Sequence, residues 1–138
     1  MTGVQTCALP IFSTRASTGT GDATLIAGVV VSGAAPKRVL IRAAGPSLTQ
    51  FGVAGALARP QLTLFSGTSI VATNAGWSTS PDAAAIAEAA TRTGAFSFGA
   101  TSADAALIVN LAPGPYTAQV IGVAGTTGTA LIEIYELP

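Results

Sequence analysis

The sequence predicts an all-β fold: an antiparallel β-sandwich of about seven to eight strands with one short surface helix near residues 81–92. The first observation behind this prediction is that short runs rich in Val, Ile and Leu recur at a regular spacing along the chain. The second is that Gly- and Pro-rich turns separate these runs. The third is that only one stretch of the chain has a helical pattern.

The first half of the chain contributes four predicted strands. Residues 22–31 place apolar side chains on both faces, which indicates a strand that is covered on both sides. Residues 37–43 form the next strand, and a long packed connection follows it through a Gly-Pro pair. Residues 61–65 and 70–73 flank a Ser-Gly-Thr turn and therefore predict a β-hairpin.

The stretch STSPDAAAIAEAATRTG is the one with a helical pattern. Ser80 is a candidate N-cap, Pro81 suits the first helical position, and Asp82 favours the positive end of the helix dipole. The Ala-rich run that follows is a strong helix former, and Arg92 with Gly94 marks its end. Because the stretch offers few large side chains, we expect the helix to be short and to lie on the surface.

The second half contributes three predicted strands, at residues 105–111, 116–123 and 129–137. The Pro-Gly-Pro turn at 113–115 precedes Tyr116, whose ring we expect to point inward while its hydroxyl bonds to the backbone. A Gly-Thr-Thr-Gly segment separates the last two strands and predicts a hairpin loop, so we expect those strands to pair.

The opening MTGVQTCALPI differs from the rest of the chain, because it has no strand or helix period and holds the single Met1 and the single Cys7. The string TGVQTCALPI looks like a sequencing adapter read through as codons, as occurs in metagenomic data. We therefore interpret residues 1–11 as a non-native artefact and residues 12–138 as one β-sandwich domain. On this interpretation the domain has no native cysteine, and the natural start of the protein lies outside the sequence.

The composition argues against several classes of partner and location. The formal net charge is zero, so the chain offers no cationic surface for nucleic acid. No apolar run is long enough for a membrane-spanning helix, so we expect no membrane insertion. Charged residues make up only 9% of the chain, and a surface kept soluble by Thr, Ser and Gly instead favours an extracellular or cell-surface location.

Residue types that carry chemistry are scarce in this chain. It has no His, which removes the usual general base and the usual metal ligand. The six acidic residues are scattered, without the spacing of a calcium loop or the facing carboxylates of a glycosidase. We therefore expect no enzyme activity, no catalytic residue, no bound metal and no cofactor.

Two lone charges, Arg42 and Glu133, lie inside predicted apolar strands. An unpaired buried charge is costly, so we expect these residues to be half-buried and paired with each other. Asp104 is a second candidate partner for Arg42. We interpret the three residues as a structural ion-pair group rather than a ligand site.

Trp77 and Asn74 lie where the chain leaves the predicted hairpin. An exposed Trp beside an Asn would be suited to stacking on a sugar ring, so these two residues are the candidate binding residues. In preference to this, we interpret the Trp77 ring as packing on the rim of the sandwich core, against Leu62, Leu64 or Ile70.

Four stretches, taken together and in order, resemble a known kind of module: KRVLIRAAGPSL, PQLTLFSG…IVATNAGW, DAALIVNLAPGPYTAQV and GTTGTALIEIYEL. The module is found near the C-termini of large secreted or surface proteins of environmental bacteria, and the resemblance covers roughly residues 13–137. More loosely, the chain resembles the bacterial pre-peptidase C-terminal domains, which are jelly-roll-like β-sandwiches. The NAGW stretch departs from the more acidic form often seen in the module.

This resemblance implies a non-catalytic accessory module of a secreted or cell-surface protein. Its role would be that of a spacer, a stabilising unit, or an adhesion and assembly unit. The expected partners are other domains of the same parent protein or a surface polysaccharide. The alternative function is a carbohydrate-binding module that uses Trp77 and the adjacent loops.

Overall fold

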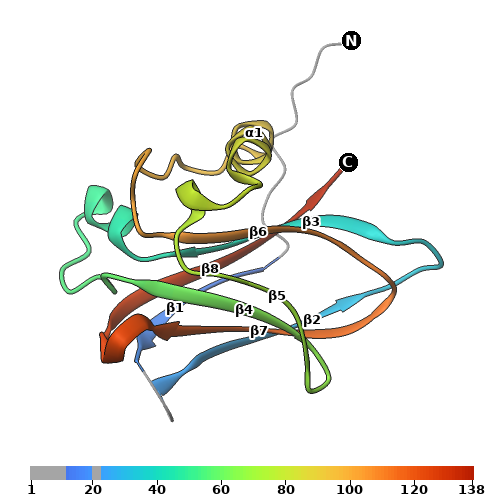
Figure 1. Ribbon diagram of the computed structural model, residues 1–138, viewed down its shortest axis with the longest axis horizontal. Helices are drawn as coiled ribbons and strands as arrows, with labels where there is room; N and C mark the ends of the chain where they lie inside the picture. The colour runs from blue at the N-terminus through green and yellow to red at the C-terminus, as the bar shows by residue number, and fades with distance from the viewer. Residues whose placement is uncertain (1–11, 20–22) are drawn as a thin grey trace.

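The computed structural model describes residues 12–19 and 23–138, within which eight strands form two four-stranded antiparallel sheets (Figure 1). The strand order is β1-β8-β3-β6 in one sheet and β2-β7-β4-β5 in the other. We call the first the covered sheet, because helix α1 packs on its outer side, and the second the open sheet. The strands are β1 (Phe12–Thr18), β2 (Leu25–Val31), β3 (Lys37–Ala44), β4 (Pro60–Ser66), β5 (Ser69–Asn74), β6 (Ala105–Leu111), β7 (Gly114–Gly122) and β8 (Gly128–Leu137).

The strands pair in a nested pattern. Strand β1 pairs with β8, β2 with β7, β3 with β6 and β4 with β5, and every pair is antiparallel. The innermost pair, β4 and β5, is the hairpin that the sequence predicts. The predicted antiparallel β-sandwich with one short helix is confirmed.

The connection between β7 and β8 corrects one prediction. These strands do not form a hairpin but lie in different sheets, and the 3₁₀ turn η4 (Val123–Gly125) lies between them. The physical reason is burial, since Val120 of β7 and Ile132 of β8 both belong to the core between the sheets. Placing the two strands in opposite sheets lets each contribute a buried face to that core.

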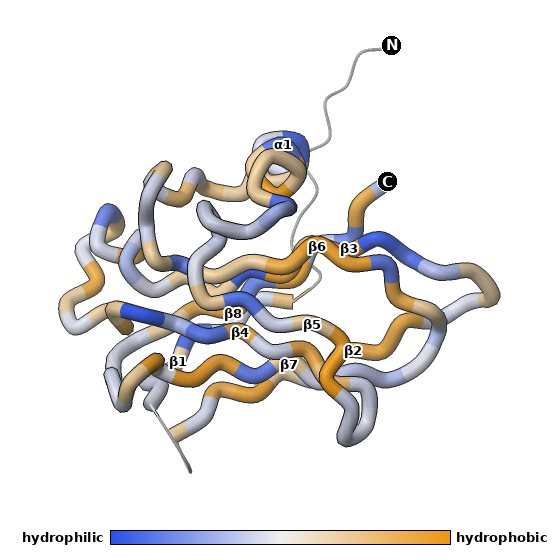
Figure 2. The backbone as a smooth tube through the Cα atoms, in the orientation of Figure 1, coloured by the Kyte–Doolittle hydropathy of each residue, from blue (hydrophilic) through white to orange (hydrophobic). Residues whose placement is uncertain are grey.

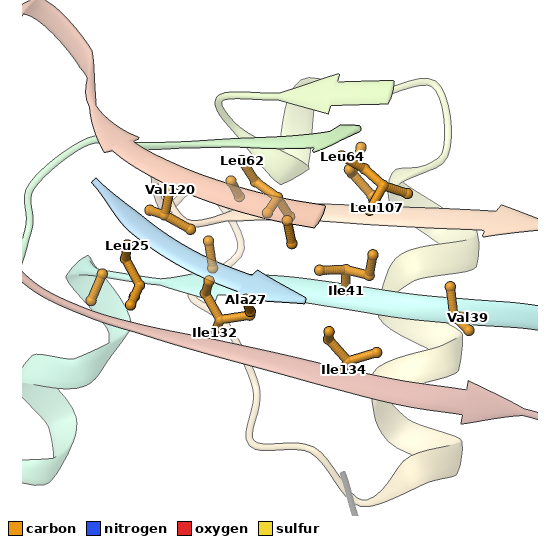
Figure 3. Packing of buried hydrophobic residues seen from close by; sticks show 14 of the residues in the cluster. Leu25, Ala27, Val39, Ile41, Leu62, Leu64, Leu107, Val120, Ile132 and Ile134 are labelled. Atoms are coloured by element: carbon orange, nitrogen blue, oxygen red, sulfur yellow. The ribbon is translucent and has the colours of Figure 1, made fainter. Parts of the chain in front are cut away.

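The main core fills the space between the two sheets, and Figure 3 shows its side chains converging from both sides. Val39, Ile41, Leu107, Ile132 and Ile134 come from the covered sheet. Leu25, Ala27, Leu62, Leu64 and Val120 come from the open sheet. The alternation of side chains along each strand selects these residues, because every second position faces the other sheet.

Helix α1 (Ala83–Thr93) lies over the outer side of the covered sheet (Figures 1 and 2). A second, smaller core fills the space between the helix and this sheet. Ile86 and Ala89 of the helix pack there with Leu40 of β3 and Tyr135 of β8. The central strands β3 and β8 of the covered sheet are therefore buried on both faces beneath the helix. This explains why β3 is buried from its third residue to its end instead of alternating between buried and exposed positions.

The start of α1 differs from the prediction. Asp82, not Ser80, occupies the N-cap position, and the helix begins at Ala83. The Ser80 hydroxyl instead accepts a hydrogen bond from the backbone N–H of Asp82, at 3.1 Å, in the turn before the helix. The predicted end is confirmed, because Gly94 adopts a left-handed conformation (φ 75°) at the C-cap, which glycine does at little cost.

The edge strand β1 was missed by the sequence analysis. Its segment, FSTRAST, alternates exposed polar residues with partly buried ones and pairs along its whole length with β8. The interpretation of residues 1–11 as an artefact lies outside the described residues. Among the residues that are described, no helix is long and apolar enough to cross a membrane.

Candidate functional site

Arg42 lies on the outer face of the covered sheet and is 1% exposed. Its neighbours Ile41 and Ala43 face the main core, so the alternation of β3 turns Arg42 toward the helix-covered side. The register of β3 and β8 places Glu133 directly opposite, and the Arg42 Nε atom lies 3.1 Å from Glu133 Oε1. The ion pair is thus a cross-strand pair that strand register imposes.

The guanidinium of Arg42 is enclosed by the segment that follows α1. Its Nη1 atom donates a 2.6 Å hydrogen bond to the backbone carbonyl of Phe96. Its central carbon lies 3.9 Å from the ring centroid of Phe98 and 4.4 Å from that of Phe96, which is cation–π geometry. Burial lowers the pKa of Arg42, while the carboxylate of Glu133 opposes this shift by stabilising the charged form.

The other oxygen of Glu133 is held by Tyr135, two residues along the same strand. The Tyr135 hydroxyl donates a 2.9 Å hydrogen bond to Glu133 Oε2. Burial raises the pKa of Tyr135, and the adjacent carboxylate raises it further, because a phenolate there would be desolvated and would face another anion. Arg42, Glu133 and Tyr135 therefore form one buried polar chain across β3 and β8.

Four aromatic rings contact one another in the order Phe51, Phe96, Phe98 and Trp77, and the middle two lie over the guanidinium of Arg42. The successive ring centroids lie 4.9, 5.8 and 6.3 Å apart, and each pair is tilted or edge-on. The sequence analysis did not single out Phe96 and Phe98. The only signal was two Phe residues at positions i and i+2 in the loop GAFSFGA, which carries no strand or helix period.

Asp104 is fully buried but is not the hydrogen-bonding partner of Arg42. Its carboxylate accepts hydrogen bonds from the backbone N–H groups of Gly45 (2.7 Å) and Ser47 (3.1 Å). It also accepts from the hydroxyls of Ser47 and Ser102. Asp104 thus anchors the Gly-Pro-Ser-Leu turn, where the 3₁₀ helix η2 (Pro46–Phe51) begins, to the start of β6.

Asn74 ties β5 of the open sheet to β6 of the covered sheet. Its Oδ1 atom accepts hydrogen bonds from the backbone N–H groups of Gly76 and Ala106, both at 3.1 Å. Its Nδ2 atom donates to the carbonyl of Gly76 at 3.2 Å. Both polar atoms of the amide are therefore engaged by the protein backbone.

Trp77 is half-buried and belongs to the second core, not the main one. The expectation that its ring packs on Leu62, Leu64 or Ile70 is wrong. The ring instead lies beside Phe98, and its Nε1 atom donates to Ser102 Oγ (3.2 Å) and to the carbonyl of Gly99 (3.3 Å). The turn η3 (Trp77–Thr79) leads toward α1 on the outer side of the covered sheet, and this carries the ring away from the space between the sheets.

The structure brings Trp77 and Arg42 together at one cavity under α1, with a volume of about 120 Å³. The remaining lining comes from α1 and from the segment after it: Ile86, Ala87, Ala90, Thr91, Ser97 and Phe98. Asn74 and Asp104 do not line this cavity. Within residues 12–19 and 23–138, no three His, Cys, Asp or Glu side chains gather as metal ligands.

Comparisons with known proteins point to a shared fold. The sequence matches no protein-family model and no curated protein. Among solved structures, the chain is similar to the crystal structure of the pre-peptidase C-terminal domain of a collagenase from Bacillus anthracis. The TM-score is 0.52 at 16% sequence identity, and the match covers 91% of this chain and 89% of that one. The protein therefore has the β-rich fold of a pre-peptidase C-terminal domain.

Proposed function

We propose that this protein is a non-catalytic accessory module of a secreted or cell-surface protein, acting as a spacer, a stabilising unit or an adhesion and assembly unit. The observation that carries this proposal is the fold-level likeness to a domain of a bacterial collagenase, which extends over 91% of the chain. An extracellular location is part of the same proposal.

The use of the polar residues supports a structural role. The carboxylates of Glu133 and Asp104 are buried and engaged by neighbouring protein groups. Both polar atoms of the Asn74 amide bond to the backbone. An enzyme instead needs a nucleophile or base within reach of substrate, together with a group that orients it.

The outer face of the open sheet supports contact with a neighbouring domain of the parent protein. Val30 is 73% exposed and Ile26 is 57% exposed on edge strand β2, and Ile70 is 63% exposed on edge strand β5. Along β2 and β7, the outward residues that pair with each other are apolar or uncharged. A sheet face of this composition is suited to packing against another protein surface.

Substitution of Trp77 separates this proposal from carbohydrate binding. In an accessory module the ring covers the second core, so Trp77→Ala should lower the free energy of unfolding by about 3 kcal/mol, because it removes a large packed aromatic. The matched variant Trp77→Phe keeps most of the packing and loses the Nε1 donor, so it should cost about 1 kcal/mol. Chemical denaturation of the three proteins measures both values.

The same proteins are then tested for retention on insoluble polysaccharides. The accessory role predicts no specific retention of the wild-type protein or of either variant. Retention of the wild-type protein that disappears in Trp77→Ala, with the unfolding free energy changed by less than about 0.5 kcal/mol, would instead establish the ring as a sugar-binding platform.

A further inference from the structure

The strands of the open sheet carry no charged residue. Within residues 12–19 and 23–138, every Lys, Arg, Asp and Glu lies on the covered sheet, on α1 or in a connecting segment. Charged side chains are one means by which proteins keep the edge of a sheet from pairing with another chain. The two edge strands of the open sheet, β5 and β2, therefore depend on other means of protection.

Strand β5 is protected in two ways. Its pairing with β4 shifts register after Leu64, and such an irregularity makes an edge less suited to further pairing. Its end is also tied to β6, because Asn74 accepts a hydrogen bond from the N–H of Ala106. Just beyond β5, the Trp77 N–H donates to the Asp104 carbonyl at 2.9 Å. The edges of the two sheets thus cover each other on this side of the sandwich.

Strand β2 has none of these protections. Its seven residues, LIAGVVV, pair with β7 without a register shift and include no Pro and no charged residue. Among the described strands, none pairs with its other edge. The edge strand β1, by contrast, exposes Arg15. A regular apolar edge such as β2 is suited to take up one more strand through its free backbone N–H and C=O groups.

The sequence of β2 matches a second copy of itself. In an antiparallel pair centred on Gly28, every cross-strand pair of side chains is apolar, and such pairs stabilise a sheet. The pairs in this register are Ile26 with Val30, Ala27 with Val29 and Leu25 with Val31. The same register keeps the core-facing residues of both copies on one side, so the two open sheets become one continuous sheet.

The charge of the sheet also favours a second copy as the added strand. Because the open sheet has no charged residue, joining two of them places no like charges opposite each other. A pair related by a two-fold axis uses β2 of both copies, so it closes as a dimer and leaves no β2 edge for further growth.

We propose that β2 is a dimer interface, at which two copies of this chain pair their β2 strands antiparallel about Gly28. The interface is a sheet edge and leaves the outer face of the open sheet free, so it does not depend on the accessory role proposed above. One pair of strands buries less surface than a standard interface, so we expect a weak dimer with a Kd of about 10–100 µM.

The wild-type chain tests the dimer and its location. Sedimentation is measured from about 1 µM to about 1 mM, with a reducing agent that excludes disulfide-linked dimers through Cys7. Along an edge strand every second N–H points away from the sheet, so alternate amides of β2 should exchange hydrogen more slowly as the dimer forms. Amides of β5 should not change. A chain that stays monomeric throughout, or a dimer with unprotected β2 amides, would overturn the proposal.

Two double variants test the register. Ile26→Lys/Val30→Lys places Lys opposite Lys twice in the pair and should weaken the dimer about tenfold or more. Ile26→Lys/Val30→Glu introduces as many charges but places each Lys opposite a Glu of the other copy, so it should dimerise at least as well as the wild-type protein. Positions 26 and 30 are about 13 Å apart within one strand, so the opposite charges do not pair within one copy. Both residues are exposed, so both variants should fold.

Ile70→Lys is the control for charge elsewhere on the same sheet, because Ile70 is exposed on the opposite edge strand, β5. Pairing through β2 predicts an unchanged dimer in this variant. Equal weakening by the two double variants would contradict the register centred on Gly28. Loss of the dimer in Ile70→Lys would place the contact on the outer face of the sheet or at β5, and would also overturn the proposal.

Discussion

Arg42 shows how one buried charged residue needs several neighbouring groups to compensate its charge. A guanidinium that is 1% exposed must be compensated, and here Glu133, the Phe96 carbonyl and two aromatic rings share that task. The pairing of Arg42 with Glu133 could be anticipated from the sequence, because lone charges in apolar strands need partners. The aromatic cover could not, because Phe96 and Phe98 lie in a loop whose pattern carries no periodicity.

Removing one member of the buried pair should be more damaging than removing both. Arg42→Ala leaves Glu133 buried and uncompensated, so we expect a loss of about 2–4 kcal/mol in the free energy of unfolding. The double variant Arg42→Met/Glu133→Leu fills the same space with apolar atoms, and its loss should be smaller than that of Arg42→Ala. Urea denaturation of the three proteins checks this order. A double variant less stable than Arg42→Ala would contradict it.

Tyr135 should make the protein sensitive to alkaline pH. Its pKa is raised in the folded state by burial and by Glu133, so the folded protein keeps the proton while the unfolded chain loses it above about pH 10. The unfolded state then binds fewer protons, and the free energy of unfolding falls as pH rises past that value. In Tyr135→Phe this fall should be smaller. Melting curves between pH 8 and pH 11.5 measure how steeply the stability of each protein falls with pH. Identical slopes for the wild-type protein and Tyr135→Phe would contradict the explanation.

At the scale of elements, the turn at Gly45 joins β3 to the 3₁₀ helix η2 and passes very close to another loop. A Cβ atom at Gly45 would lie 2.1 Å from the backbone carbonyl oxygen of Leu57, and the Gly45 N–H donates to Asp104. Only glycine at position 45 allows the close approach to Leu57 together with the hydrogen bond to Asp104. The turn is therefore fixed from two sides, by a close approach and by a buried carboxylate.

Gly45→Ala should destabilise the fold strongly, by about 3 kcal/mol or more, because backbone atoms must shift to admit the methyl group. Gly28→Ala in β2 is the control, because a Cβ atom there would have no neighbour within 4 Å. The control should be neutral or slightly stabilising, since alanine is favoured over glycine within a strand. Thermal melts compare the two, and similar melting temperatures would show that the loop around Leu57 yields easily.

The sequence predicted most of the strands and the helix, but it predicted less well which strands pair and which core a side chain joins. Short apolar runs between Gly- and Pro-rich turns identified seven of the strands, and the Ser-Gly-Thr turn identified the β4–β5 hairpin. The predicted pairing of β7 with β8 was wrong, because a short connection fits a crossing between sheets as well as a hairpin. Trp77 was assigned to the wrong core for a related reason. A local pattern shows that a side chain is buried but not against which layer.

At the scale of the whole molecule, two N-terminal deletions, one ending before the edge strand β1 and one including it, test which N-terminal residues the fold requires. The sequence-based interpretation of residues 1–11 as an artefact predicts that deleting them changes the melting temperature by no more than about one or two degrees. Deleting residues 1–18 is the control, because it also removes β1 and its pairing with β8, and it should lower the melting temperature much more. A fall of around 10 °C in the first deletion would overturn the artefact interpretation.

The nested strand pairing has a consequence for the route by which the chain folds. Among the described strands, β4 and β5 are the paired strands that follow each other directly in the sequence, whereas β1 and β8 come from opposite ends of the chain. Closing a long loop costs entropy before the contacts are gained, so the outer pairs are costly to form first. Once β4 and β5 have paired, the loop that must close to pair β3 with β6 is effectively shorter, and each closure shortens the next. The nested strand pairing thus favours assembly from the middle of the chain outward. Strands β1 and β8 would then pair last, after the rate-limiting step. Substitutions in this pair would therefore change the rate of unfolding more than the rate of folding.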